Sequence, residues 1–296
     1  MRFLLATLWS AAAITLAFPA HAATPPVPGT RALGLGGALR GAATGDSALT
    51  LNPSGMSLMR AYVIEAAYLH DSAGSATSNL GRLSIVDSTS GFNVAGGVYY
   101  NYLAQDLGAG IERSGHEGAA ALSLPLGERL FIGGTVKYLR LSTTGTAPTR
   151  GFTFDAGITI KPVGSVSLGV SGQNLVDKHT DRAPRMLGGG ITVGATQDLL
   201  FVLDAVLDFT SRRDSGGADK KVWSIMGGGE YLFAKTFGVR LGGGRRGLGD
   251  KGYLAGGASY IAQIGAIDFG IQQDLSGNAR ETIIGVSARL FLPAPE

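Results

Sequence analysis

Residues 152–160 of the chain read FTFDAGITI. Every second residue from Phe152 to Ile160 is apolar, and the residues between them are Thr, Asp, Gly and Thr. A period of two places the apolar side chains on one face of an extended strand and the small or polar ones on the other, whereas an amphipathic helix has a period near 3.6. The stretch therefore predicts a β-strand with one apolar face and one face of small or polar residues.

The same alternation recurs through the chain from Tyr62 onwards, for example in residues 166–171, 199–209, 237–242 and 267–272. We count about fourteen such segments, beginning near Tyr62, Asn79, Phe92, His116, Arg129, Gly151, Ser165, Arg185, Leu199, Lys221, Thr236, Gly252, Ile264 and Glu281. The connections between them alternate in length. Short ones are expected at 125–128, 161–164, 195–198, 233–235 and 262–263, and longer polar ones at 71–78, 105–115, 142–150, 176–184 and 211–220. An even number of strands, with short turns at one rim and longer loops at the other, is typical of an outer-membrane β-barrel. Both termini are then expected at the short-turn, periplasmic side.

The chemistry of the second face separates this interpretation from a soluble β-sandwich. A sandwich strand shows water a charge-rich face, whereas here that face is mostly Gly, Ser, Thr and Asn with isolated charges. We expect ten charged side chains to point into the barrel: Glu65, Arg82, Lys137, Asp155, Asp204, Asp208, Glu230, Arg240, Asp268 and Arg289. The opposite register would place them in lipid, at a cost of ~2–4 kcal/mol for each basic residue at mid-depth. Aromatic residues near strand ends are expected to form interface girdles, or simply reflect strand propensity: Tyr68, Tyr100, Tyr102, Tyr138, Trp223, Tyr231 and Tyr260.

Composition agrees with an exported all-β protein. Charged residues make up 16% of the 296 residues, and 47 residues are glycine, more than twice normal usage. The net charge is only +3 and the basic residues are scattered, so nucleic acid is not an expected partner. The chain has no Cys, which suits export through an oxidising compartment.

The N-terminus has the three parts of a cleaved signal peptide. Arg2 supplies the charge, residues 3–18 are apolar, and Ala20-His21-Ala22 forms a small-residue cleavage site. We therefore divide the chain into a signal peptide (1–22), an N-terminal hatch or plug (23–60), a transmembrane barrel (61–292) and a C-terminal tail (293–296). The expected location is the outer membrane of a Gram-negative bacterium.

The N-terminal segment resembles a known family. Residues 32–38 (ALGLGGA), 46–49 (DSAL) and 51–56 (LNPSGM) are similar to the N-terminal hatch of FadL-like outer-membrane proteins, which have a glycine-rich start and an Asn-Pro-Ala signature before the first strand. Ser54 stands where the family usually has Ala. A weaker match, at residues 169–175 (GVSGQNL) with Pro184 after it, is similar to a segment of the PorV-type branch.

The resemblance implies an all-β fold, a 14-stranded antiparallel transmembrane β-barrel with an N-terminal hatch inside the lumen. It implies that a hydrophobic ligand enters from outside, is held in an apolar pocket beside the hatch, and leaves once the hatch shifts. The hatch or gating residues would be Asn52, Pro53, Ser54, Gly34, Gly36 and Gly37, and the polar lumen residues Asp155, Asp204, Asp208, Lys137 and Arg240. Asn52 can also bond nearby backbone in a plain Asx-turn, and the lumen charges can simply pair with one another and with Arg31 and Arg40.

No pattern in the sequence predicts an enzyme. The glycine-rich hatch lacks the Lys-Ser/Thr of a phosphate loop, and His70, His116 and His179 lack the spacing of a metal site or a catalytic triad. We expect no cofactor, no metal ion and no catalytic residue. The expected partners are outer-membrane lipid and a hydrophobic small-molecule ligand, with envelope proteins as a further class.

Three functions remain open. The leading one is transport of hydrophobic, fatty-acid-like molecules by a hatch-gated route. The second is a non-transporting, PorV-like component of a secretion or surface-motility apparatus, favoured by the absence of the long capture loops of fatty-acid transporters and by Gln173-Asn174-Leu175. The third is a structural envelope protein or a general pore.

Overall fold

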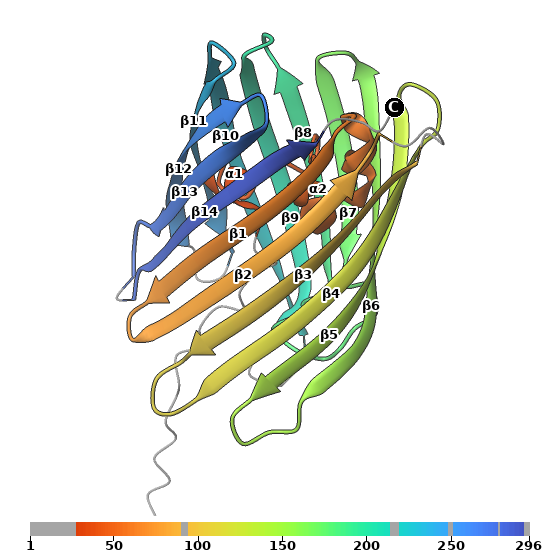
Figure 1. Cartoon of the computed structure of the whole chain (residues 1–296). Helices are drawn as coiled ribbons and strands as arrows, with labels where there is room; N and C mark the ends of the chain where they lie inside the picture. Colours follow the sequence, from red (N-terminus) through yellow and green to blue (C-terminus); the bar gives the residue numbers. More distant parts are fainter. Residues whose placement is uncertain (1–27, 90–93, 214–218, 248–250, 278, 293–296) are drawn as a thin grey trace, which may run out of the picture.

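Fourteen antiparallel strands close into one barrel, in which every strand pairs with its neighbours in the chain and β1 also pairs with β14 (Figure 1). The computed structural model describes residues 28–89, 94–213, 219–247, 251–277 and 279–292. The strands are β1 (Tyr62–Ala73), β2 (Ala76–Asp87), β3 (Ala95–Asp106), β4 (Glu112–Pro125), β5 (Leu130–Thr143), β6 (Thr149–Val163), β7 (Val166–Gln173), β8 (Met186–Gly194), β9 (Leu199–Arg213), β10 (Asp219–Phe233), β11 (Phe237–Arg246), β12 (Lys251–Ala262), β13 (Gly265–Asp274) and β14 (Glu281–Leu292). The expected strand number is confirmed. The predicted signal peptide and C-terminal tail lie outside the described residues.

The two faces of the strands have the expected register. In β6 the apolar side chains from Phe152 to Ile160 are exposed on the outside, while Thr153, Asp155 and Thr159 are buried inside. All ten charged residues expected in the lumen point inward; Asp208 and Arg289 are half-buried and the other eight are buried. A sheet that shows large aliphatic residues to its surroundings and hides its charges is built for a lipid environment. Within the described residues, no helix is long and apolar enough to cross a membrane.

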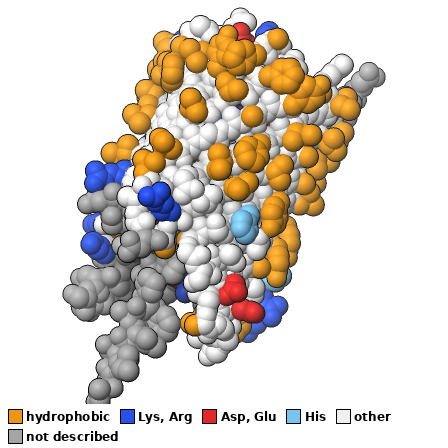
Figure 2. Space-filling model, turned by 90° about the vertical axis from the view of Figure 1, so that its left-hand side faces the viewer, with side chains coloured by type: hydrophobic (Ala, Val, Ile, Leu, Met, Phe, Trp, Pro, Cys, Tyr) orange, Lys and Arg blue, Asp and Glu red, His pale blue; other side chains and the backbone are white. Residues whose placement is uncertain are grey.

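Exposed aromatic residues form two girdles around the outer wall. One girdle, near the rim where β1 ends, contains Tyr68, Tyr100, Tyr102, Tyr138 and Trp223; the other contains Tyr231, Phe233, Phe237 and Tyr260. Figure 2 shows hydrophobic side chains over most of one outer face, and most of the charged side chains visible there lie toward its lower end. Paired girdles at the two ends of an apolar band mark the interfaces of a membrane-spanning barrel.

The connections are shorter than expected at the rim where β1 ends. The loops predicted at 71–78, 105–115 and 142–150 are reduced to residues 74–75, 107–111 and 144–148. The polar residues that suggested loops are instead paired in strand ends that extend beyond the apolar band. Only the connection between β7 and β8, residues 174–185, is long at this rim among the described residues.

The described part of the predicted hatch lies within the barrel. It contains two short α-helices, α1 (Thr30–Gly34) and α2 (Asp46–Leu51), and the 3₁₀ helix η1 (Pro53–Leu58). We call residues 29–60 the luminal segment. In Figure 1 its helices lie among the strands, toward the rim where β1 begins and β14 ends. Apolar residues of the segment, among them Leu35, Leu39, Leu49 and Met56, form a buried cluster that reaches Val86, Tyr99 and Val202 on the wall.

Candidate functional site in the barrel lumen

The luminal segment follows the inner wall around the barrel, and it touches the wall where the strands carry glycine. A Cβ placed on the inward-facing glycine of successive strands would come within 3.4 Å of the segment's atoms. These glycines are Gly285 in β14, Gly270 in β13, Gly257 in β12, Gly242 in β11, Gly228 in β10, Gly188 and Gly190 in β8, Gly169 in β7, Gly157 in β6, Gly133 in β5 and Gly97 in β3. Glycine in a strand interior often marks a close approach of another backbone. Eleven of the 47 glycines therefore serve this one contact.

Asn52, Pro53 and Ser54 form a buried turn against β5 and β6. The Asn52 amide donates to the carbonyl of Arg40 at 2.9 Å and to the Thr159 hydroxyl at 3.0 Å. Its side-chain oxygen accepts from the Ser54 hydroxyl at 2.7 Å and from the Ser54 backbone N–H, which caps η1. The expected Asx-type bonding is thus present, and in addition Asn52 ties two parts of the segment to the wall. The gating role of these three residues stays a prediction.

Gly34, Gly36 and Gly37 lie at the bend after α1. A Cβ on Gly34 would be 3.1 Å from the Cα of Gly257. Gly36 and Gly37 have φ of 72° and 86°, a region that L side chains rarely adopt, and Gly36 also approaches the backbone of Gly243. Glycine is needed here for chain reversal and close packing, and whether the three positions gate the lumen stays a prediction.

Ion pairs hold Arg31 and Arg40 of the luminal segment against the wall. Arg31 pairs with Glu230 at 2.6 Å, and Glu230 also accepts from Arg240. Arg240 in turn pairs with Asp268 at 2.9 Å, which gives a continuous network across β10, β11 and β13. The expected pairing of the lumen charges with Arg31 and Arg40 is present in the structure.

Asp204 is the second anchor of the segment. Its carboxylate accepts from the backbone N–H groups of Leu39 and Arg40 at 3.0 Å each, and from the Arg40 guanidinium at 3.2 Å. Arg40 also donates to Gln173 at 3.1 Å, and Gln173 donates to the carbonyl of Thr50. Through Gln173, these bonds join Arg40 to Thr50, which belong to two separate parts of the luminal segment.

A third anchor joins α2 to the opposite wall. Asp46 pairs with Arg82 of β2 at 2.9 Å, and Arg82 also donates to Asn101 at 2.8 Å. Nearby, Lys137 pairs with Asp155 at 2.7 Å. Asp208 differs from the other polar lumen residues, because it is only half-buried and accepts from the Thr210 backbone at the end of β9.

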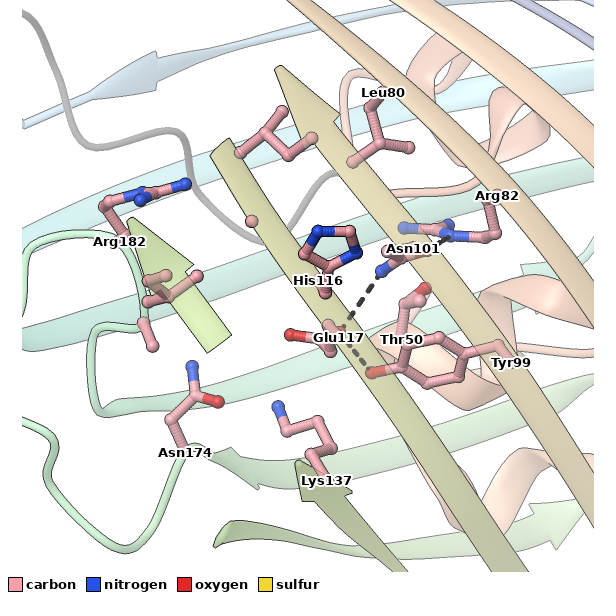
Figure 3. Close-up of a pocket in the computed structure, with 14 residues that line it drawn as sticks. Thr50, Leu80, Arg82, Tyr99, Asn101, His116, Glu117, Lys137, Asn174 and Arg182 are labelled. Atoms are coloured by element: carbon pink, nitrogen blue, oxygen red, sulfur yellow. Dashed lines mark hydrogen bonds between the residues drawn. The ribbon is translucent and has the colours of Figure 1, made fainter. Parts of the chain in front are cut away.

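A cavity of about 80 Å³ lies between the luminal segment and the β7–β8 connection. Thr50 of α2 forms part of its floor, strands β2–β5 form its wall, and Asn174, Arg182 and Ala183 line the side of the connection (Figure 3). The lining is mixed: Leu80, Leu103 and Leu141 are apolar, whereas Arg82, Glu117, Lys137 and Arg182 are charged. The lining thus differs from that of the apolar pocket that the family resemblance implies, and that pocket stays a prediction. The cavity is suited to a small molecule with one polar end.

Glu117 lies in the middle of the charged lining. Its carboxylate accepts from the Tyr99 hydroxyl at 2.6 Å and from the Asn101 amide at 3.2 Å, as the dashed lines in Figure 3 show. One carboxylate oxygen accepts both bonds, so the other has capacity left to accept from a ligand that carries a donor.

The β7–β8 connection closes the cavity toward the rim. The Arg182 guanidinium donates to the carbonyls of Ser114 and Ser142 at 2.9 Å each, and Asp181 pairs with Arg113 at 3.3 Å. Burial and the nearby Arg113 lower the pKa of Arg182 to about 10. The guanidinium remains charged at neutral pH, although its buried environment disfavours that charge.

The wall itself is incomplete where this connection leaves it. Strands β7 and β8 have 8 and 9 residues, whereas their neighbours β6 and β9 have 15 each. The connection replaces part of the missing wall: Leu175 N–H donates to the carbonyl of Phe154, and the Thr153 hydroxyl donates to the carbonyl of Val176. A displacement of the connection would therefore expose the cavity both at the rim and beside β6.

The base of the connection explains the Gln-Asn-Leu motif. Asn174 has φ of 52°, a left-handed conformation that Asn tolerates. Its side chain donates to the carbonyl of Pro184 at 2.9 Å, and its backbone N–H donates to Asp155 at 2.8 Å. Asn174 thus joins the two ends of the β7–β8 connection and attaches its first residue to Asp155, which faces the lumen.

Sequence reasoning missed two residues of this site. Glu117 was hidden because the strand was expected to begin near His116, whereas β4 begins at Glu112 and places Glu117 well inside it. Arg182 lies in a connection with no periodicity, so no local pattern could place its side chain. Asp46 had a signal, since it belongs to the hatch motif, but its partner Arg82 is 36 positions away.

The closed 14-stranded barrel has counterparts among solved structures. The CymD monoaromatic hydrocarbon channel superposes with a TM-score of 0.72 and 12% identity, covering 92% of this chain and 99% of that one. The chain has the FadL-like barrel fold. The toluene transporter TbuX of Ralstonia pickettii superposes equally well, with a TM-score of 0.72, 12% identity, and 91% and 100% of the two chains covered. A FadL homologue from Pseudomonas aeruginosa gives 0.66 at 12% identity, with 90% and 98% covered.

The FadL-like fold is thus shared over nearly the whole of each chain although few residues are identical. No protein-family model and no curated protein matches this sequence. The proteins that share the FadL-like fold include transport channels, and the fold is what this chain has in common with them.

Proposed function

We propose that this FadL-like barrel carries small hydrophobic molecules across the outer membrane of a Gram-negative bacterium, and that the luminal segment acts as its hatch. The observation that carries the proposal is the small internal cavity, enclosed by the luminal segment on one side and the β7–β8 connection on the other. The barrels with the same fold include a monoaromatic hydrocarbon channel and a toluene transporter. A small aromatic hydrocarbon would contact the leucines that line the cavity, Leu80, Leu103 and Leu141. A polar group on the ligand would face Glu117 or Lys137.

The size of the cavity requires movement. An apolar cavity of about 150 Å³ is known to bind benzene, and the cavity here has about 80 Å³. A single aromatic ring would therefore have to displace one of its boundaries. Two boundaries are candidates: the luminal segment near Thr50, and the connection held by Arg182. In this proposal the connection opens to admit ligand and the luminal segment shifts to release it.

Asn52, Pro53 and Ser54 are proposed to latch the segment, and Gly34, Gly36 and Gly37 to form the bend about which it moves. If the turn leaves β6, it loses the hydrogen bond from the Asn52 amide to the Thr159 hydroxyl and the one between the hydroxyls of Ser54 and Thr159. The bend packs on glycine backbones of β11 and β12, and the Tyr253 hydroxyl donates to the carbonyl of Gly36 at 2.7 Å. The polar lumen residues Asp155, Asp204, Lys137 and Arg240 are proposed to hold the closed state.

A disulfide lock tests both halves of the proposal, because the native chain has no Cys. The hydroxyls of Ser57 in η1 and Ser123 in β4 are 2.8 Å apart, so Ser57→Cys with Ser123→Cys brings two thiols within bonding reach. Cells that lack their own hydrocarbon channel would express the double variant, the Ser57→Cys single variant as control, or the native chain. Uptake of labelled toluene would then be measured under oxidising and reducing conditions.

We expect the native chain to raise uptake above that of cells without it. Oxidation should block uptake through the double variant only, and reductant should restore it. No uptake by the native chain contradicts the transport function. Unchanged uptake by the oxidised double variant, with the disulfide verified by mass spectrometry, contradicts the hatch while leaving transport intact.

A second candidate is a non-transporting component of an envelope machine, like the PorV-type proteins. It is favoured by the short connections at the rim where β1 ends, which leave little for substrate capture and give a partner protein access to the barrel mouth. Stoichiometric co-purification of a partner after mild solubilisation, together with absent toluene uptake, supports this function against the first.

A further inference from the structure

A row of exposed side chains on the outer wall contains two arginines that have no acidic partner among the described residues. Tyr102, His116, Arg140 and Arg150 stand directly opposite one another on β3, β4, β5 and β6. All four side chains are exposed and point away from the lumen. Two arginines at directly opposed positions of a sheet repel each other. Among the described residues neither guanidinium has a carboxylate partner; the outward-facing Glu112 is four positions further along β4, about 13 Å at strand rise.

The row has a defined depth in the membrane. The next outward row toward the barrel centre contains Tyr100, Tyr138 and Phe152, with the rings of Tyr138 and Phe152 5.1 Å apart. Tyr100 and Tyr138 belong to the aromatic girdle at this rim, as does Tyr102, and girdles lie at the level of lipid headgroups. The Tyr100 hydroxyl is 2.6 Å from Nδ1 of His116, which links the two rows. The arginines therefore stand level with Tyr102 at the outer edge of the girdle, about 7 Å further along the strands than Tyr100 and Tyr138.

A second group of cations repeats this pattern on the same side of the barrel. Arg185, just before β8, and Lys221 in β10 flank the ring of Phe209 at 5.8 and 6.0 Å, and both are exposed. The exposed Trp223 follows Lys221 on the outer face of β10. Cations that have no carboxylate partner within the described part of the chain thus extend from β5 to β10 at one rim, and each group lies close to an aromatic residue.

We propose that the Arg140–Arg150 pair, with His116 and Tyr102 beside it, binds the phosphate of an anionic lipid in the leaflet that meets this rim. A phosphate between the two guanidiniums removes their repulsion and accepts hydrogen bonds in the bidentate geometry that arginine favours. The neighbouring Tyr and Phe rings lie against the upper acyl chains, so headgroup and chains are held at matching depths. Basic clusters at membrane surfaces bind anionic headgroups in this way.

The test measures binding of phosphatidic acid by native mass spectrometry of the full barrel in mild detergent, with phosphatidylcholine as the uncharged comparison. The variant is Arg140→Gln with Arg150→Gln. The matched control is Arg129→Gln with Lys161→Gln, which removes two cations at the opposite rim. Folding of each is verified by circular dichroism and by its heat-dependent migration on gels.

The native barrel should prefer phosphatidic acid over phosphatidylcholine. We expect affinity for the first bound phosphatidic acid to fall roughly fivefold for each arginine removed, near 25-fold for the double variant, and the control to stay within about twofold of the native barrel. The proposal is overturned if the Arg140/Arg150 variant binds phosphatidic acid as the native barrel does, if the control loses as much affinity, or if the native barrel shows no preference. The result does not depend on whether the barrel transports anything.

Discussion

Adding one methyl group at the inner wall should loosen the luminal segment. In Gly157→Ala the new Cβ would overlap Oδ1 of Asn52 and lie 3.0 Å from Cδ of Pro53. Asn52 is fully buried and cannot rotate away without leaving its bonds to Arg40 and Thr159. The wall strand is paired on both sides, so the luminal segment has to move.

The size of the effect follows from these contacts. Overpacking of this kind costs about 1–3 kcal/mol, and one buried polar group that loses its partner costs about 1–3 kcal/mol more. We therefore expect the docked position of the segment to be weakened by about 2–6 kcal/mol. The matched controls are Gly118→Ala and Gly81→Ala, outward-facing positions where an added Cβ meets nothing within 4 Å. These should be neutral or slightly stabilising, because alanine lowers the chain entropy lost on folding.

Labelling of a single cysteine reports the movement. Thr50→Cys places a thiol at the cavity floor, where the native residue is 6% exposed, and the chain has no other thiol. In refolded proteoliposomes, Gly157→Ala should speed labelling by a small water-soluble thiosulfonate at least 30-fold, the factor that 2 kcal/mol allows, whereas the controls should label at the parent rate. Equal rates in all three would refute the idea that the glycines hold the segment by close approach.

Two further substitutions test the anchor between Arg40 and Asp204 and the position of the β7–β8 connection over the cavity. Arg40→Ala breaks its buried pair with Asp204 and should lower the free energy of unfolding in urea by about 3–5 kcal/mol, whereas Arg113→Ala, at a partly exposed pair, should cost less than about 1 kcal/mol; similar losses would contradict the assigned anchor. Arg182→Ala removes the two bonds that hold the β7–β8 connection across the mouth and should speed Thr50→Cys labelling roughly tenfold. Lys178→Ala in the same connection should leave that labelling rate unchanged. An equal effect of the two substitutions would mean that Arg182 does not hold the connection over the cavity.

The strands and their register could be predicted because the sequence repeats one local rule. A period-two pattern needs no knowledge of distant residues, and the cost of placing Asp204 or Arg240 in lipid fixes which face is inside. Strand ends were harder. Polar residues such as Ser78 and Ser142 look like loop residues, yet they lie in strands that continue past the apolar band.

The site was predictable only in part, because its geometry depends on residues far apart in the chain. The buried turn at Asn52 follows from local chemistry, but its contact with Thr159 does not. Glycine is neither clearly apolar nor polar, so it does not reveal which face of a strand it occupies. The sequence therefore indicated many glycines without indicating that eleven of them line one path around the wall. Arg182 and Glu117 meet in the cavity only after the barrel closes.

The way the luminal segment is held bears on how it could release. Its glycine contacts are backbone packing, which is short-ranged and lost over small displacements. Directional restraint comes from polar contacts, including those of Arg31, Arg40, Asp46 and Asn52. Arg31, Arg40 and Asn52 bind wall residues that do not line the cavity. Asp46 differs, since its partner Arg82 lines the cavity beside Tyr99 and Asn101. A ligand that enters the cavity and draws Arg82 toward itself would weaken one anchor directly, and because Asp46 begins the helix that carries Thr50, that anchor is the one closest to the cavity floor. Coupling between ligand and hatch therefore needs no relay through the barrel wall.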